Sequence, residues 1–247
     1  MHGWSAGHLI ARQDWAAGLA TFTVAAEVER FAPGQFVNLA LEVGGTVERR
    51  SYSIASPPGQ PLAFLLTEVA GGALSPHLFR LTPGDEVLVE RKPQGFFTLE
   101  WVPPAAELWL VATGTGLGPF LAHLGDGALW ERFERVILVH GVREARHLAH
   151  REELRSLVRE RGGRFAYVAA TSREPAADST LHGRVTTLFG DGTVERAAGA
   201  ALDPARSHLM LCGNPAMIEE LTTLLAERGL NKHRVRKPGH ITVEKYW

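Results

Sequence analysis

The spacing of hydrophobic residues divides the chain into two parts with different periods. Up to about Trp101, short apolar segments are separated by turn sequences such as APGQ, VGGT and TPGD. Runs rich in Val, Phe, Leu and Thr between such turns predict β-strands. We expect them at 22–28, 35–43, 50–56, 62–69, 85–91 and 95–101. About six strands at this spacing predict an antiparallel barrel or sandwich.

A second pattern begins after the sequence VPPAAE. Compact apolar runs at 108–114, 135–142, 164–172 and 207–214 are each followed by a loop, and helical patterns such as 148–163 lie between several of them. Alternating strands and helices predict a parallel sheet that helices cover on both faces. The stiff VPP segment places the boundary near Val102, so we expect one domain at 1–101 and another at 102–247.

Charge and cysteine content exclude several classes of protein. The 247-residue chain has 26 Lys and Arg against 27 Asp and Glu, so it lacks the global positive field that would hold nucleic acid or an anionic membrane. The amino end does not match a secretory signal, and no run approaches the roughly 18 apolar residues of a membrane span. The lone Cys212 suits a reducing compartment and excludes a four-cysteine iron-sulfur cluster within the chain. We therefore expect a cytoplasmic location.

A glycine-rich turn follows the first strand of the second half. VATGTGLGPF places Gly114, Gly116 and Gly118 before Pro119, where the backbone can turn tightly and approach a ligand. Open α/β sheets bind ligands at the carboxyl ends of their strands, and a helix starting at Pro119 would face a diphosphate. The pattern is not G-x-G-x-x-G, so a plain strand-to-helix turn stays open as the alternative.

Basic residues follow the later strands. Arg143 comes after the second strand, Ser172 and Arg173 after the third, and Arg184 a little further on. Each arginine taken singly fits a solvated surface residue. Three guanidinium groups and a hydroxyl at successive strand ends are what a 2′-phosphate requires, so together they favour NADP over NAD.

The last strand of the second half leads into CGNPAMIEELTTLLAERGL. Asn214 with Pro215 predicts a helix start, and Gly229 predicts its end. This placement brings Cys212 to the rim of the sheet, although a buried structural cysteine is the equal alternative. The two histidines of HLAH at 147–150 lack a third ligand, so no metal site is predicted.

The first half contributes a second candidate site. In RRSYS, alternation places Arg50 and Tyr52 on one strand face and Ser51 and Ser53 on the other. Arg50 suits a diphosphate, Tyr52 a flat ring and Ser53 the edge of that ring. In GGALSP, Gly71 and Gly72 permit close backbone approach, and Ser75 with Pro76 predicts a short helix. Taken alone, a charged edge strand and a simple capped turn are the alternatives.

These segments together resemble the bacterial ferredoxin/flavodoxin-NADP reductases of the ferredoxin-NADP reductase superfamily. RSYS is similar to the family's R-x-Y-S flavin motif, GGALS to its diphosphate segment, ATGTGLGPF to its nucleotide loop and CGNPAMI to its C-G-N-P element. The ending GHITVEKYW looks like the aromatic terminus of the bacterial subclass. The resemblance covers both halves in the same order.

The resemblance implies an FAD-binding antiparallel β-barrel followed by an NADP-binding α/β domain. The FAD positions it implies are Arg50, Ser51, Tyr52, Ser53, Leu66, Thr67, Ala73, Leu74, Ser75, Thr115, Tyr246 and Trp247. The NADP positions are Arg143, Ser172, Arg173, Arg184 and Asn214. Relatives carry a longer or basic residue where this chain has Ala73, so backbone contacts must serve there.

The implied reaction is hydride transfer between NADPH and flavin N5, followed by single-electron transfer to ferredoxin or flavodoxin. Ser53 would bond near N5, Cys212 would line the nicotinamide side, and Glu244 is the candidate carboxylate near the carboxyl end. A flavin or quinone reductase and the reductase component of an oxygenase are alternatives within the superfamily. A nucleotide-binding electron-transfer subunit without turnover is the alternative from another class.

Overall fold

The structure is a computed structural model that describes residues 3–175, 177–178 and 180–246. The chain divides into two compact units. The first takes the chain up to Leu99 together with Gly118–Gly127, and the second takes Glu100–Leu117 and the chain from Ala128 onward. Within the described residues, no helix has the length and apolarity to cross a membrane.

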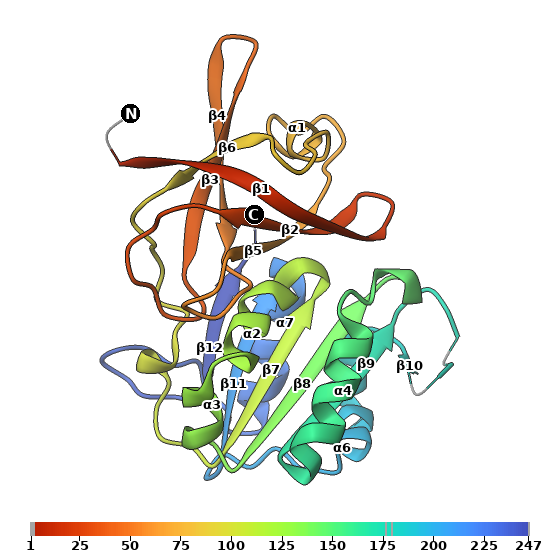
Figure 1. Ribbon diagram of the computed structural model, residues 1–247. Coiled ribbons are helices and arrows are strands. Elements are labelled where there is room, and N and C mark those ends of the chain that lie inside the picture. Colours follow the sequence, from red (N-terminus) through yellow and green to blue (C-terminus); the bar gives the residue numbers. More distant parts are fainter. Residues whose placement is uncertain (1–2, 176, 179, 247) are drawn as a thin grey trace. The chain divides into compact units, whose positions relative to one another are not determined.

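The first unit is built on an antiparallel sheet (Figure 1). Within the described chain, six strands pair in the order β4-β3-β6-β1-β2-β5. Their bounds are β1 Trp4–Ala16, β2 Leu19–Ala25, β3 Phe36–Val43, β4 Thr46–Ser53, β5 Leu62–Thr67 and β6 Glu86–Glu90. Just past the edge strand β4, the Ala55 N–H donates to the Ala63 carbonyl in the opposite edge strand at 2.7 Å. The sheet thus curls toward closure, which confirms the predicted antiparallel barrel.

The core of this unit consists of the side chains that face inward at every second position of its strands. Phe22 and Phe64 are paired across β2 and β5, and both are almost completely buried. Val37 and Val89 join them from β3 and β6, on the inner face of the same sheet. The inward set therefore follows the period-two pattern read from the sequence.

Two elements of the first unit differ from the sequence prediction. The 13-residue β1 was not predicted, because only Gly7 and Leu9 along it are buried and its remaining positions are exposed or half-exposed. The strand predicted at 95–101 is wrong. Gly95 takes a left-handed φ of 107°, and the chain then forms the short 3₁₀ helix η1, Leu99–Trp101. Gly95 breaks the extended run because only glycine adopts such a φ readily.

The second unit holds a parallel sheet (Figure 1). In the part of the chain that is described, six strands follow the order β10-β9-β8-β7-β11-β12. Their bounds are β7 Glu107–Thr113, β8 Arg135–Val142, β9 Phe165–Thr171, β10 Thr180–His182, β11 Ser207–Gly213 and β12 Ile241–Lys245. Every adjacent pair is parallel, which confirms the predicted α/β domain. The chain moves outward from β7 to β10 on one side and continues with β11 on the other, so its switch point lies between β7 and β11.

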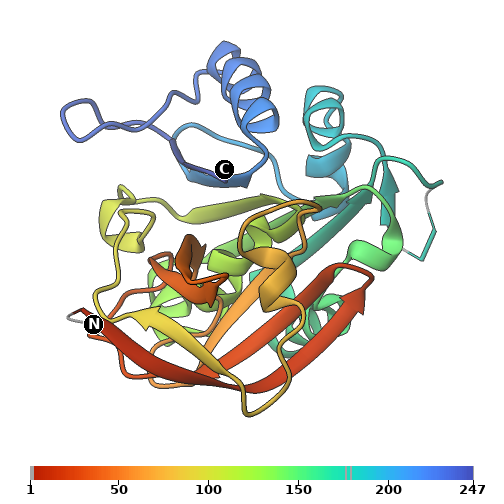
Figure 2. The same cartoon turned by 90° about the horizontal axis from the view of Figure 1, so that it is seen from above.

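Helices cover both faces of this sheet (Figures 1 and 2). The helix α4, Arg151–Arg161, packs beside β9 on one face. A large core cluster on the other face joins the sheet to α5, Val185–Gly190, α6, Thr193–Ala198, and α7, Pro215–Glu227. The remaining short helices are α1, Ser75–Leu78, α2, Gly118–Leu124, and α3, Gly127–Arg132.

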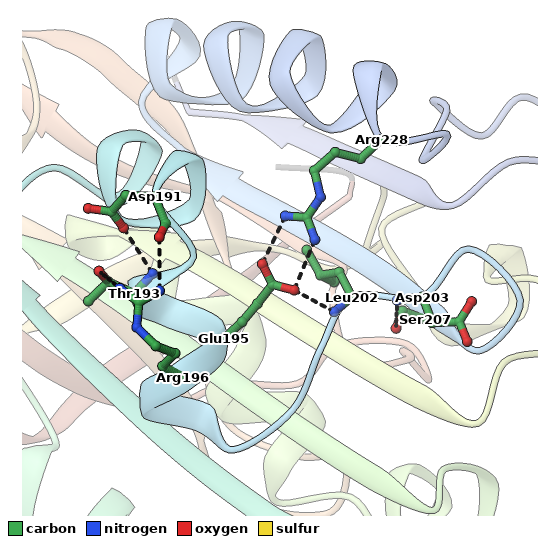
Figure 3. Close-up of polar contacts among 8 residues, drawn as sticks. All are labelled: Asp191, Thr193, Glu195, Arg196, Leu202, Asp203, Ser207 and Arg228. Carbon is green, nitrogen blue, oxygen red and sulfur yellow. Dashed lines mark hydrogen bonds and ion pairs between the residues drawn. The ribbon is translucent and has the colours of Figure 1, made fainter.

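An ion pair braces the helix layer that contains α6 and α7 (Figure 3). Glu195 of α6 accepts two hydrogen bonds of 2.9 Å from Arg228, at the end of α7, and one of 2.7 Å from the Leu202 N–H. Partial burial alone would raise the pKa of Glu195, but the bonds from Arg228 and Leu202 outweigh it and hold that pKa below its usual value. This carboxylate therefore ties α6, α7 and the segment leading to β11 together.

Candidate functional site

A backbone cradle lies at the switch point of the parallel sheet. The turn after β7 forms the 3₁₀ helix η2, Gly114–Leu117, beside the end of β11. A Cβ on Gly116 would lie 2.4 Å from the Cys212 carbonyl oxygen, and one on Gly213 would lie 2.3 Å from Thr113 Oγ1. Both positions therefore require glycine, and the two turns meet through bare backbone.

Thr113 and Asn214 lock this cradle. The Asn214 N–H donates to Thr113 Oγ1 at 2.9 Å, which joins the end of β7 to the start of α7. The Asn214 side-chain oxygen accepts from the N–H groups of Ala216 and Met217, so the predicted helix start at Asn214 is confirmed. Its side-chain oxygen is occupied by the cap, which leaves the amide NH₂ as the group that could meet a nucleotide.

Cys212 and Glu244 are neighbours at the end of the sheet. They are paired across β11 and β12, and Cys212 Sγ lies 4.0 Å from a carboxylate oxygen of Glu244. Cys212 is the next-to-last residue of β11 and is fully buried, which confirms the alternative of a buried cysteine. Burial, reinforced by the Glu244 charge, raises the pKa of Cys212 well above its usual value. The thiol is therefore protonated and serves as a hydrogen-bond donor.

The predicted basic residues converge at the carboxyl ends of β8, β9 and β10. Beyond the paired strands, the Arg173 N–H donates to the Arg143 carbonyl at 2.9 Å, and the Ser172 N–H donates to Val142 at 3.0 Å. Arg184 stands two residues past β10, immediately before α5. The chain thus carries all three arginines and Ser172 to one edge of the sheet.

The side chains of these arginines are exposed to solvent. Within the described chain, the guanidinium groups of Arg143, Arg173 and Arg184 have neither a carboxylate nor a hydrogen-bond partner. Nearby Arg146, in contrast, is paired with Glu144 at 2.6 Å. Three unpaired cations beside a backbone cradle fit a dinucleotide that carries an additional phosphate.

The residues of the R-x-Y-S segment lie at the end of β4 in the first unit. Arg50 has an exposed side chain that donates to the Arg49 carbonyl at 2.6 Å and lies 3.9 Å from Glu48 of the same strand. Tyr52 packs half-buried against the core, and burial raises the pKa of its phenol although the Arg50 charge opposes this. Tyr52 is therefore a neutral flat ring beside an exposed cation.

Ser51 and Ser53 have different surroundings. The Ser51 hydroxyl donates to the Asn38 side chain at 2.8 Å on the opposite face from Arg50, so its side chain is already satisfied. Ser53 is 8% exposed at the last position of β4. This nearly buried position at the strand end is compatible with the ring-edge contact expected of Ser53.

The glycine segment 69–75 forms a closed turn before α1. The Ser75 hydroxyl accepts from the Val69 N–H at 2.9 Å, and the Gly72 N–H donates to the Val69 carbonyl at 2.9 Å. A Cβ on Gly72 would lie 3.0 Å from that carbonyl. Ser75 therefore holds the turn, and α1 with its four residues is too short for a strong helix dipole.

The remaining predicted FAD positions in the first unit offer mainly backbone groups to a ligand. The side chains of Leu66 and Leu74 are buried in the core, while Thr67 is exposed and Ala73 half-buried. A turn without bulky side chains lets the backbone approach a diphosphate, and the exposed Arg50 offers a cation to the same kind of group. Thr115 is half-exposed in η2, Tyr246 donates its N–H to Gly213 at 3.1 Å, and Trp247 lies outside the described residues.

Sequence reasoning missed two residues of the switch-point site. Thr113 could have been found because it is the last residue of a strand that ends at the glycine turn. His140, in the middle of an apolar run, carried only one signal, which is that histidine is uncommon in a fully buried strand. Its Nε2 lies 3.1 Å from the Gly114 carbonyl.

Known proteins resemble the chain over its whole length. The family model described as an oxidoreductase NAD-binding domain matches residues 110–223. Flavodoxin/ferredoxin-NADP reductases of Shigella flexneri and Escherichia coli are each 41% identical over 249 residues, covering all of both chains. A ferredoxin-NADP reductase of Pseudomonas aeruginosa is 36% identical over 87% of this chain and 86% of its own.

A solved structure shows the same arrangement of elements. It is a ferredoxin NADP⁺ reductase from Neisseria gonorrhoeae with bound FAD and NADP, and it superposes with a TM-score of 0.93 at 29% identity over 99% of each chain.

Proposed function

The chain belongs to the flavodoxin/ferredoxin-NADP reductase family, and we propose that it is an FAD-dependent oxidoreductase linking NADPH to a ferredoxin or flavodoxin. The preference for NADP over NAD is proposed on one observation, the unpaired arginines that follow β8, β9 and β10. A salt-bridged arginine would have to break existing bonds in order to bind a phosphate, whereas these three arginines would not. We propose residues 1–101 as the FAD domain and 102–247 as the NADP domain.

Bound FAD supplies the exchange of a hydride at N5 and the separate release of single electrons. The protein's part is to bind, orient and exclude water. We assign Arg50 to the diphosphate, Tyr52 to one face of a flat ring and Ser53 to a hydrogen bond at the ring edge. The backbone of Ser51 and of the other predicted FAD positions completes this site, which explains why Ala73 needs no long side chain.

The NADP side has a matching division of roles. Arg143, Arg173 and Arg184 bind the 2′-phosphate with Ser172, since charge-assisted bonds from arginine suit a phosphate. Asn214 contributes its amide NH₂ beside the cradle of Gly116 and Gly213.

Cys212 and Glu244 are proposed as the catalytic pair at the nicotinamide. The protonated Cys212 thiol donates toward Glu244, so the pair can hold one proton in place beside the reacting ring. Because the thiol keeps its proton, Cys212 does not act as a nucleophile. Tyr246 and Trp247, which follow Glu244 in the chain, are proposed to cover the flavin.

The partner is proposed to be a small protein electron carrier, a ferredoxin or a flavodoxin. Cytoplasmic location is proposed on the lone, buried Cys212 and the absence of any cysteine to pair with it. The near-neutral charge balance supports a protein that does not bind nucleic acid or a membrane surface.

Carrier reduction tests the proposal. Purified protein loaded with FAD is mixed with NADPH and, separately, with a bacterial ferredoxin, a flavodoxin and a quinone. Reduction of either protein carrier at a rate above that of the quinone supports the proposal. Fast quinone reduction with no transfer to either carrier would instead support a quinone reductase, and no oxidation of NADPH would support a subunit without turnover.

A further inference from the structure

His140 occupies a position in β8 that is shaped to hold a ring. It is 0% exposed and pairs with Ala112 of β7 on one side and Ala169 of β9 on the other. These two alanines are small, so they leave room for the imidazole ring on the same face of the sheet. The packing alone would accept an apolar side chain equally well.

The hydrogen bonding of His140 points to a specific task. A carbonyl oxygen only accepts, so Nε2 must carry the proton in the 3.1 Å bond to Gly114. Burial, which the bond to Gly114 only partly offsets, lowers the pKa of His140 to about 4, so the ring is neutral with a bare Nδ1. Nδ1 is buried and has no partner among the described residues. A leucine at position 140 would fill the same space without a buried, unsatisfied nitrogen. The contribution specific to histidine is therefore its hydrogen bond to the Gly114 carbonyl.

Gly114 is the hinge of the turn. It has a left-handed φ of 55°, and no described residue lies within 4 Å of where its Cβ would be. Glycine in open space does not fix its own peptide plane. Because a trans peptide is planar, drawing the Gly114 carbonyl toward His140 turns the N–H of Thr115 to the opposite side.

We propose that His140 is a positioning residue for the pyridine dinucleotide: its bond to Gly114 sets the Gly114–Thr115 peptide plane and holds η2 in the conformation that receives the nucleotide. This inference rests on the proposed NADP function. His140 acts through the backbone of the turn and not by contact with the reacting atoms.

A matched pair of variants tests this role. His140→Leu removes the donor, while His140→Gln keeps an N–H donor of similar reach. His123→Leu is the control, because His123 is also buried and bonds through Nε2 to a carbonyl, that of Phe97 in the first unit, at 3.2 Å. For each FAD-loaded variant, calorimetry measures the binding of NADP⁺ and of adenosine 2′,5′-bisphosphate, a fragment that carries the 2′-phosphate without the nicotinamide half.

We expect His140→Leu to weaken NADP⁺ binding roughly tenfold, the size of one net hydrogen bond, and to leave the bisphosphate within about twofold. The KM for NADPH should rise while kcat stays nearly constant, and His140→Gln should recover most of the loss. His123→Leu should lose stability without changing NADP⁺ affinity. Equal loss for both ligands, or none for either, would overturn the role of His140, whereas a parent protein that binds neither ligand would overturn the NADP function itself.

A measurement on the unaltered protein covers the case in which His140→Leu does not fold. The ¹⁵N shifts of the imidazole should show the neutral Nε2–H tautomer down to about pH 5. An Nδ1–H tautomer or a charged ring at pH 7 would contradict the proposed bond.

Discussion

Acid should unfold this protein through its buried histidines. His123 and His140 are fully buried, and burial lowers the pKa of each from 6.5 to about 4. His208 is 2% exposed, bonds to Thr242 at 2.9 Å, and has its pKa lowered to about 3, mainly by burial and secondly by His233. The unfolded chain therefore takes up these protons first, so stability is full above about pH 6.5 and falls as the pH drops toward 4.

The magnitude follows from these pKa values. A pKa lowered from 6.5 to about 4 is worth about 3 kcal/mol once the unfolded histidine is fully protonated, and about 2 kcal/mol at pH 5. Three such residues would remove about 6 kcal/mol at pH 5, a large part of the 5–15 kcal/mol typical of a folded protein. His140 and His208 lie in the second unit, which should therefore lose about twice as much as the first.

Urea unfolding between pH 7.5 and 5, followed by flavin fluorescence and near-UV circular dichroism, measures this loss. Near pH 5 each histidine should contribute a slope of about 1.2 kcal/mol per pH unit. His140→Gln and His123→Gln should each flatten the curve by that amount. If both variants keep the full slope, or if the two rings titrate near pH 6.5 in the folded protein, the reasoning is refuted.

Three further outcomes are expected from the site and the helix layer. Replacing Arg173 and Arg184 by alanine should lower kcat/KM for NADPH by a factor of about 10² to 10⁴, from about 1.5 to 3 kcal/mol for each charge-assisted contact, and spare NADH. Gly116→Ala should cost about 2 kcal/mol or more and weaken NADP⁺ binding, because its Cβ would lie 2.4 Å from the Cys212 carbonyl oxygen, as calorimetry will show. Glu195→Gln should lower the free energy of unfolding by about 1 to 3 kcal/mol in urea titrations, since it loses a charge-assisted pair with Arg228.

Each of these variants has a matched control. Arg159→Ala removes an exposed arginine of α4 and should leave NADPH use unchanged. If the Arg173 and Arg184 double variant loses activity equally with NADPH and NADH, the 2′-phosphate assignment is contradicted. Gly127→Ala places its Cβ in open space and should be nearly neutral. Glu134→Gln breaks an exposed 2.8 Å pair with Arg206 and should cost under about 1 kcal/mol. A Glu195→Gln loss no larger than this would contradict the bracing role.

The fold was predictable where periodicity is strong. Strand β8 was predicted at 135–142 and observed there, because a continuous apolar run in a central parallel strand has no competing interpretation. β10 and β12 were missed, since one has three residues and the other alternates polar and apolar residues at the edge of the sheet. Edge strands bury less apolar surface and therefore leave a weaker signal in the sequence.

The candidate site was predictable to the level of strand ends. Arg143 and Arg173 follow strands whose carboxyl ends must share one edge of the sheet, so their convergence was expected. The bond from His140 to Gly114 was not, because it depends on which face of β8 the ring takes and on the conformation of the next loop. The engagement of Ser51 by Asn38 depends in the same way on cross-strand register.

Anaerobic mixing of the FAD-loaded protein with NADPH or NADH tests the central claim most directly. The flavin absorbance near 450 nm should bleach rapidly with NADPH and much more slowly with NADH, and the reduced protein should then pass single electrons to ferredoxin or flavodoxin. A protein that takes up no FAD, or whose flavin stays oxidised in NADPH, would contradict the account.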